Sequence, residues 1–89
     1  MGKIKWSFKK LEKFLKDYNF SLGHIEGSHY FYNGKIKGEQ RVVQVILSRK
    51  ERECQTKKTI EMAIKHSGIP KEYFEEWDKN GIVHKNIIS

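Results

Sequence analysis

The chain has 89 residues, which is the length of one small domain. Eighteen Lys and Arg against eleven Asp and Glu give it a formal net charge of +7. Its apolar stretches are too short to span a membrane, the early lysines are unlike a secretory signal, and a lone cysteine excludes an intramolecular disulfide. We therefore expect one cytoplasmic domain over residues 1–89, without metal or cofactor, whose basic surface favours a polyanionic partner and not a membrane.

The first predicted element is an amphipathic helix over residues 8–18. Ser7 is a suitable N-cap, because its hydroxyl can accept a hydrogen bond from a free amide of the first turn. Asn19 tolerates the left-handed conformation that ends many helices. The apolar residues of this segment follow at helical spacing: Phe8, Leu11, Phe14, Leu15 and Tyr18.

From Phe20 onward the apolar residues have the two-residue period of a strand. A turn at residues 26–28 precedes a second strand that begins with the aromatic run 29–32, which is rich in β-formers. The dipeptide Asn33-Gly34 is a strong hairpin signal, and a later glycine extends the predicted connection over residues 33–40.

The third predicted strand covers residues 41–47, the most β-branched segment of the chain. It has little polar alternation, so it should be covered on both faces or lie centrally in the sheet. We interpret the basic stretch that follows, residues 48–55, as a linker within the domain.

Thr56 can cap a second helix with Ile60, Ala63 and Ile64 on one face, and Gly68 suits its end. Pro70 suits the start of a short third helix, whose apolar stripe consists of Tyr73, Phe74 and Trp77 and which ends at Gly81. Residues 82–89 could be an added strand, a packed tail, or a segment that is disordered until a partner binds.

The predicted order is therefore helix, three strands, helix and short helix. Sequential strands joined by short turns form an antiparallel sheet, and two helices on one face close a two-layer α+β domain. This is also the outline of double-stranded-RNA-binding domains. We place the core of the domain in residues 7–77.

Of four histidines, His29 has the most suggestive surroundings. His66 ends a predicted helix, where a cation interacts well with the dipole, and His84 lies in the tail without a chemical neighbour. His29 follows Gly27-Ser28 at a turn and begins a strand in a chain rich in Lys and Arg. Cleavage of RNA without a metal needs proton transfer near neutral pH and cations around a charged transition state, and these residue types provide both.

Several other residues could bind phosphate or bases. Lys57 and Lys58 follow Thr56 at a predicted helix N-terminus, a favourable place for an anion, although both could equally be ordinary solvated side chains. Tyr30 and Tyr32 could stack on bases, but packing in the core and over the sheet is the more common outcome. Four further cations are candidates for binding phosphate, and no sequence pattern favours one of them over the others: Arg41, Arg49, Lys50 and Arg52.

Over residues 7–77 the chain resembles the HicA toxin family. The matching residues are Ser7, Leu11, Leu15, Phe20, Leu22, Gly27-Ser28-His29, Tyr32, Val43, Val45, Thr59, Ile60, Ile64, Gly68, Ile69 and Phe74. The resemblance implies a fold like that of double-stranded-RNA-binding domains, with His29 as the catalytic residue and Gly27 and Ser28 in its loop. It also implies an mRNA interferase, a toxin that cleaves mRNA and is restrained by a HicB-like antitoxin protein.

The chain departs from the family's pattern at a few positions. Asn19 stands in place of a glycine, and His24 and Glu26 replace frequent basic residues. A carboxylate at Glu26 could orient His29, could raise the pKa of His29, or could weaken phosphate binding. The third strand also ends without the Pro and His often found there.

Our leading hypothesis is an endoribonuclease toxin in which His29 acts as general acid and base without a metal. A non-catalytic RNA-binding module of the same architecture is the first alternative. The second is a protein-interaction domain that binds another chain through the acidic helix near residues 71–78.

Overall fold

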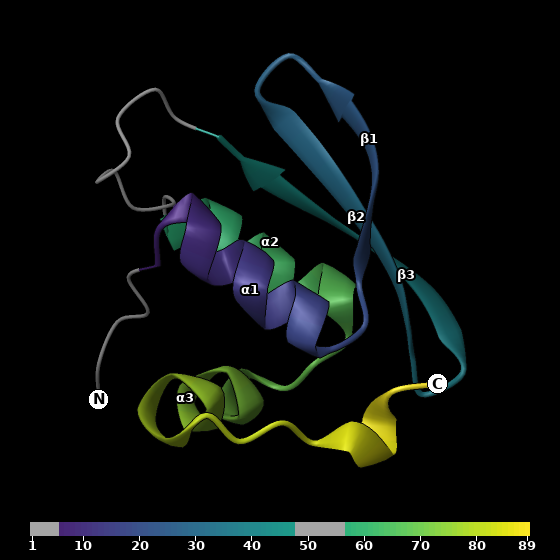
Figure 1. The fold of residues 1–89 in the computed structure, drawn as a ribbon, viewed down its shortest axis with the longest axis vertical. Helices are drawn as coiled ribbons and strands as arrows, with labels where there is room; N and C mark the ends of the chain where they lie inside the picture. The colour runs from purple at the N-terminus through teal and green to yellow at the C-terminus, as the bar shows by residue number, and fades with distance from the viewer. Residues whose placement is uncertain (1–5, 48–56) are drawn as a thin grey trace.

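The structure, a computed structural model, describes residues 6–47 and 57–89. In chain order its elements are α1 (Phe8–Asp17), β1 (Ser21–Glu26), β2 (His29–Ile36), β3 (Glu39–Ile46), α2 (Lys57–Ser67), α3 (Lys71–Asn80) and the short 3-10 helix η1 (Lys85–Ile87). The strands form one antiparallel sheet in the order β1-β2-β3. Figure 1 shows α1 and α2 on one side of the sheet, with α3 at the end of the molecule near the C-terminal segment. The predicted α+β class and element order are confirmed.

Helix α1 begins and ends as its sequence predicts. The Ser7 hydroxyl accepts a hydrogen bond from the Lys10 amide at 3.3 Å, which satisfies one free donor of the first turn. Asn19 follows the helix with a φ of 65°, so it does provide the left-handed exit. The apolar stripe of the helix faces the core, and its most buried members are Leu11, Phe14 and Leu15.

The hairpin turn between β2 and β3 is not at Asn33-Gly34, the strongest turn signal in the sequence, and the connection is shorter than predicted. Strand β2 runs through Asn33 and Gly34, and the turn falls at Lys37 and Gly38, with φ values of 53° and 79°. Two successive positive φ values are typical of the tight turns that join twisted antiparallel strands. Gly34 has a packing role instead, because a Cβ there would lie 2.6 Å from the ring of Phe20. The predicted connection over residues 33–40 is therefore wrong.

Strand β3 is neither central nor covered on both faces, contrary to the prediction. Strand β2 is the central strand, and β3 pairs with it alone in the sheet. Val43 and Val45 are fully buried under the helices, whereas the alternate residues Val42 and Gln44 are exposed. The β-branched run therefore reflects strand propensity and one buried face, with Val42 left as an apolar residue on the other.

The core joins α1 and α3 through stacked aromatic rings. Phe14 lies against Phe74 with 4.1 Å between ring centroids, and Trp6 contacts both. Trp77 packs on Phe14 and donates from its indole nitrogen to Asp17 Oδ2 at 2.8 Å. These contacts fix α3 against α1, as the predicted apolar stripe of the third helix requires.

The helix ends also follow the sequence. Helix α2 ends at Ser67, and Gly68 follows it with a φ of 74°. Helix α3 ends at Gly81, whose φ is 69° and whose amide donates to the Trp77 carbonyl oxygen at 2.9 Å. Glycine has no Cβ to oppose this conformation, so both helices stop where glycine is placed. Thr56, the predicted cap of α2, lies outside the described residues.

The C-terminal segment is a packed tail. The amide of Lys37 donates to the Ile87 carbonyl oxygen at 2.8 Å, and the amide of Ser89 donates to the Lys35 carbonyl oxygen at 3.1 Å. Ile87 is buried, and Ile88 forms an isolated bridge with Ile36 at the end of β2. The tail therefore closes the end of the hairpin distant from His29.

His84 has chemical neighbours, contrary to expectation. Its ring stacks on Tyr73 with 3.7 Å between centroids, its Nε2 contacts Glu76, and its backbone amide donates to the Tyr18 hydroxyl at 2.9 Å. These contacts join the tail to residues of α3 and to Tyr18, which are distant in the sequence, so no local pattern predicts them. No helix in the described ranges 6–47 and 57–89 is both long and apolar enough to cross a membrane.

Candidate functional site

The alternation of β2 sends its aromatic side chains to two faces. Tyr32 is fully buried on the face toward the helices, and its hydroxyl donates to Glu12. Burial, and then the hydrogen bond and charge of Glu12, raise the pKa of Tyr32. Tyr30 lies on the same face, edge-on to Phe8. Both tyrosines are therefore packing residues, as their more common role suggests.

His29 lies at the start of β2 on the opposite, exposed face. The turn before it contains Gly27, with a φ of 60° that favours glycine, and Ser28, whose carbonyl oxygen accepts from the Leu47 amide at 2.8 Å. The predicted site loop is thus a tight turn that the end of β3 holds in place. It positions the His29 backbone while leaving the imidazole in solvent.

The His29 ring is oriented by Gln44. The Nε2 of Gln44 lies 2.9 Å from the Nδ1 of His29, which is hydrogen-bond distance. Gln44 is on β3, two residues from the direct cross-strand partner of His29. An amide can donate to an unprotonated Nδ1 or, after a half-turn, accept from a protonated one, so it can hold the ring in either state. Nε2 is then the nitrogen on the side of the ring away from Gln44.

Glu26 is the cross-strand partner of His29, yet its carboxylate contacts a different histidine. Glu26 Oε2 lies 3.5 Å from His24 Nε2, and both side chains are exposed. The His24 ring in turn stacks on Phe31, with 4.5 Å between centroids and 5° between planes. The residue in hydrogen-bond contact with His29 is Gln44, whereas Glu26 accompanies the His24 and Phe31 pair.

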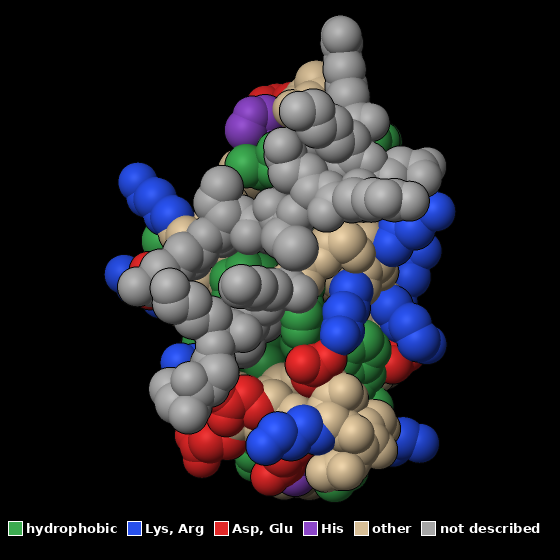
Figure 2. Space-filling model, turned by 90° about the vertical axis from the view of Figure 1, so that its left-hand side faces the viewer, with side chains coloured by type: hydrophobic (Ala, Val, Ile, Leu, Met, Phe, Trp, Pro, Cys, Tyr) green, Lys and Arg blue, Asp and Glu red, His purple; other side chains and the backbone are tan. Residues whose placement is uncertain are grey.

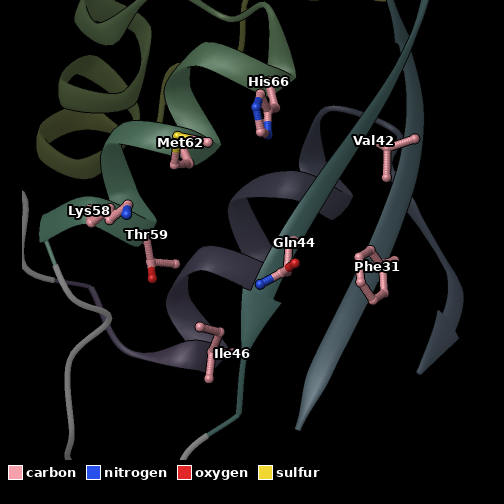
Figure 3. Close-up of a pocket in the computed structure, with 8 residues that line it drawn as sticks. All are labelled: Phe31, Val42, Gln44, Ile46, Lys58, Thr59, Met62 and His66. Atoms are coloured by element: carbon pink, nitrogen blue, oxygen red, sulfur yellow. The ribbon is translucent and has the colours of Figure 1, made fainter. Parts of the chain in front are cut away.

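A groove of about 700 Å³ lies at the edge of the sheet, where α2 runs beside β3 (Figure 3). Its residues from the sheet are Phe31, Val42, Gln44 and Ile46, and those from α2 are Lys58, Thr59, Met62 and His66. Figure 3 shows α2 running alongside β3, with Gln44 between the helix and Phe31. Because Gln44 also contacts His29, the groove borders the exposed imidazole.

Among the predicted cations, Lys58 lines the groove together with Gln44, the residue that contacts His29. It is exposed on the first turn of α2. Lys57 begins α2, but its side chain is outside what the structure describes. Arg41 alternates with Val42 onto the other face, where it pairs with Glu39 at 2.9 Å and packs against Gly68. Other predicted cations lie outside the described residues: Arg49, Lys50 and Arg52.

Charge is unevenly distributed over the molecule. Figure 2 faces the helical side and shows Lys and Arg side chains at both margins, most of them on the right, with many of the Asp and Glu side chains toward the lower end, where Figure 1 places α3. Two of the α3 acids have basic partners within the chain, since Asp78 contacts Lys10 and Glu76 contacts His84. Within the described parts of the chain, no cluster of three or more His, Cys, Asp or Glu could hold a metal ion.

Sequence reasoning missed Gln44, which contacts His29, and the other residues that line the groove. Phe31 was available from the alternation of β2, since residues two apart share a face. Gln44 could be found only after the hairpin was placed correctly, because the register decides which residue of β3 lies near His29. Met62 and His66 depend on how α2 lies beside β3, which no local pattern specifies.

Comparison of the chain with protein-family models, with curated protein sequences and with solved structures finds no match.

Proposed function

We propose that the protein is an endoribonuclease in which His29 is the catalytic residue. The observation that supports this most strongly is the exposed imidazole of His29, with Nδ1 bound by Gln44 beside a groove that contains Lys58. An oriented imidazole with one solvent-facing nitrogen is suited to proton transfer on a bound substrate. The net charge of +7 favours association with a polyanion such as RNA.

The proposed step is internal transesterification of the RNA backbone. The ribose 2′-oxygen bonds to the adjacent phosphorus as the bond from phosphorus to the 5′-oxygen breaks, leaving a 2′,3′-cyclic phosphate and a 5′-hydroxyl. His29 Nε2 accepts the 2′-hydroxyl proton, and the resulting imidazolium returns a proton to the leaving oxygen. While Nε2 is the base, Nδ1 carries hydrogen, and Gln44 accommodates it by presenting Oε1. Lys58 is a candidate for binding the substrate phosphates.

Together with the HicA resemblance, this chemistry supports a cellular role as the mRNA-cleaving toxin of a toxin–antitoxin pair in the cytoplasm. The antitoxin would be a HicB-like protein that covers His29 or the groove. A neighbouring reading frame that encodes such a protein would support this role directly.

A paired growth assay tests the proposal. Expression of the native protein should arrest growth, and His29→Ala should abolish the arrest while leaving a folded protein, since the side chain is exposed. Persistent arrest by a soluble, folded His29→Ala protein would contradict the catalytic assignment.

The two alternatives give different results in solution. A non-catalytic RNA-binding module would bind RNA, with affinity that falls steeply as salt rises, but would not cleave it. A protein-interaction domain acting through α3 would have no such salt-dependent RNA affinity. The internal partners of Glu76 and Asp78 make α3 less available for that second alternative.

A further inference from the structure

We propose that the groove beside His29 binds a single nucleobase of the RNA, stacked on Phe31, next to the phosphate that is cut. This inference rests on the proposed ribonuclease function and specifies how its substrate is held. Three features of the groove indicate a nucleobase. They are the aromatic ring of Phe31, the exposed apolar side chains of Val42 and Met62, and the polar side chains of Gln44 and Lys58.

Phe31 is already half of an aromatic stack. Its ring is parallel to that of His24 within 5°, with 4.5 Å between centroids, and His24 comes from β1. The groove is on the other side of β2, toward β3 and α2. The His24 ring therefore covers the β1 side of Phe31, while the β3 side of Phe31 borders Gln44 and the groove, where a ligand can lie beside Gln44. A flat aromatic ligand can extend this stack, and every nucleobase has a suitable π-face.

The remaining surface suits a base better than a phosphate alone. Val42 and Met62 are large apolar residues that are 46% and 39% exposed, and they line the groove from β3 and α2. A volume of about 700 Å³ accommodates a nucleotide, within the range of about 300–1,000 Å³ usual for small-molecule sites. Burying Val42 and Met62 against a base would remove apolar surface from water.

The polar groups of the groove lie where the rest of the nucleotide would be. Gln44 lines the groove and contacts His29 Nδ1 at 2.9 Å, so a base that touches Gln44 is next to the imidazole. Lys58 provides a positive charge at one end of the groove and has no ion-pair partner among residues 6–47 and 57–89. A base on Phe31 with its phosphate toward His29 and Lys58 satisfies all three features.

Binding of mononucleotides tests this inference separately from catalysis. The probes are AMP, GMP, CMP and UMP, with ribose 5-phosphate as the probe that lacks a base. They are titrated into ¹⁵N-labelled His29→Ala protein and followed by amide chemical shifts. At least one nucleotide should shift the amides of Phe31, Val42 and Met62, and ribose 5-phosphate should bind at least about tenfold more weakly.

Two variants locate the site. Val42→Trp fills the groove and should weaken nucleotide binding about tenfold or more, and Phe31→Ala should do the same by removing the stacking ring. Ile82→Trp is the matched control, because Ile82 is 43% exposed and lies outside the groove. Its affinity should equal that of the parent protein. Amide spectra and thermal melting establish that each variant is folded.

The inference is overturned if ribose 5-phosphate binds as tightly as the nucleotides, if the shifts lie outside the groove, or if Val42→Trp binds unchanged. It is also overturned if no nucleotide binds and a protein partner occupies the groove instead. The ribonuclease proposal fails by a different result, which is base binding in the groove by a native protein that cuts no RNA.

Discussion

Gln44 and His29 are joined by a diagonal hydrogen bond across β2 and β3, with 2.9 Å between Gln44 Nε2 and His29 Nδ1. In the strand register Gln44 is paired with Phe31, and His29 is paired with Ile46. One side chain therefore contacts the imidazole and also lines the groove. The proposed chemistry depends on this relationship, because it makes the orientation of His29 a property of the sheet and not of a loop.

Replacing Gln44 should change catalysis in two distinguishable ways. Gln44→Leu keeps the size of the side chain but removes its hydrogen bond, so kcat should fall about tenfold or more, because a misaligned base loses part of the usual ~10²–10⁴-fold advantage of acid–base catalysis. Gln44→Glu places a carboxylate beside Nδ1 and stabilises the imidazolium, so the acidic limb of the pH–rate profile should move to higher pH. The measurement is the pH dependence of cleavage by the purified proteins.

Gln40→Leu is the matched control for these variants. Gln40 is an exposed residue of the same strand and face, paired with Lys35 at the other end of the sheet. Its pH–rate profile should equal that of the native protein. If Gln44→Leu and Gln40→Leu had the same activity, Gln44 would have no positioning role.

Because of Tyr32, the free energy of unfolding should fall as the pH rises above 10. Burial raises the pKa of Tyr32 above the ordinary value of 10.0, so above pH 10 the unfolded chain loses this proton while the folded chain keeps it. The stability is fully present below pH 10 and is lost as pH rises beyond it, at up to about 1.4 kcal/mol per pH unit for one group. Urea unfolding at pH 8 to 11.5 measures this loss.

In Tyr32→Phe the free energy of unfolding should fall less steeply above pH 10, because the group that titrates has gone. At pH 8 the same variant should be less stable by about 1–3 kcal/mol, since Glu12 loses a hydrogen-bond donor. Lysines titrate equally in both proteins, so the comparison cancels their effect. Equal slopes above pH 10 would show that Tyr32 is not protected in the folded state.

The C-terminal tail should contribute to global stability. Ile87 is only 5% exposed and its carbonyl oxygen accepts from the Lys37 amide, so Ile87→Ala should cost about 2–5 kcal/mol. For a domain of this size each kcal/mol corresponds to roughly 4–8 °C in Tm. Differential scanning calorimetry measures the change. The exposed Ile82 provides the control, since Ile82→Ala should stay within about 0.5 kcal/mol of the native protein. Equal melting of the two variants would mean that the tail is not docked in solution.

Local signals in the sequence were sufficient to predict the three helices and those of their ends that lie within the described residues. Ser7, Asn19 and Gly81 each act within one helical turn, so their residue types specify the outcome. The hairpin was predicted wrongly because Asn33-Gly34 has the residue types of an ideal turn. A tertiary contact, the packing of Phe20 against Gly34, keeps these residues in the strand instead. Gly34 is needed where the Phe20 ring crosses the strand, and neither residue reveals this contact in the sequence.

The candidate site was only partly predictable for the same reason. The position of His29 at the start of β2, on the exposed face of that strand, follows from the turn before it and from the alternation of β2. Gln44 depends on the register of β3, and the groove depends on the place of α2 beside that strand. Arg41 was predicted to bind phosphate on the basis of its charge alone. Its position in β3 places its side chain on the face opposite His29, where it pairs with Glu39.

The central claim is that His29 cleaves RNA, and its most direct test is the cleavage rate of a single-stranded RNA by purified native and His29→Ala proteins in the presence of EDTA. The native protein should produce fragments ending in a 2′,3′-cyclic phosphate, and His29→Ala should be slower by roughly 10²–10⁴-fold at equal thermal stability. Equal rates for the two proteins, or no cleavage by either across a set of RNAs, would contradict the account.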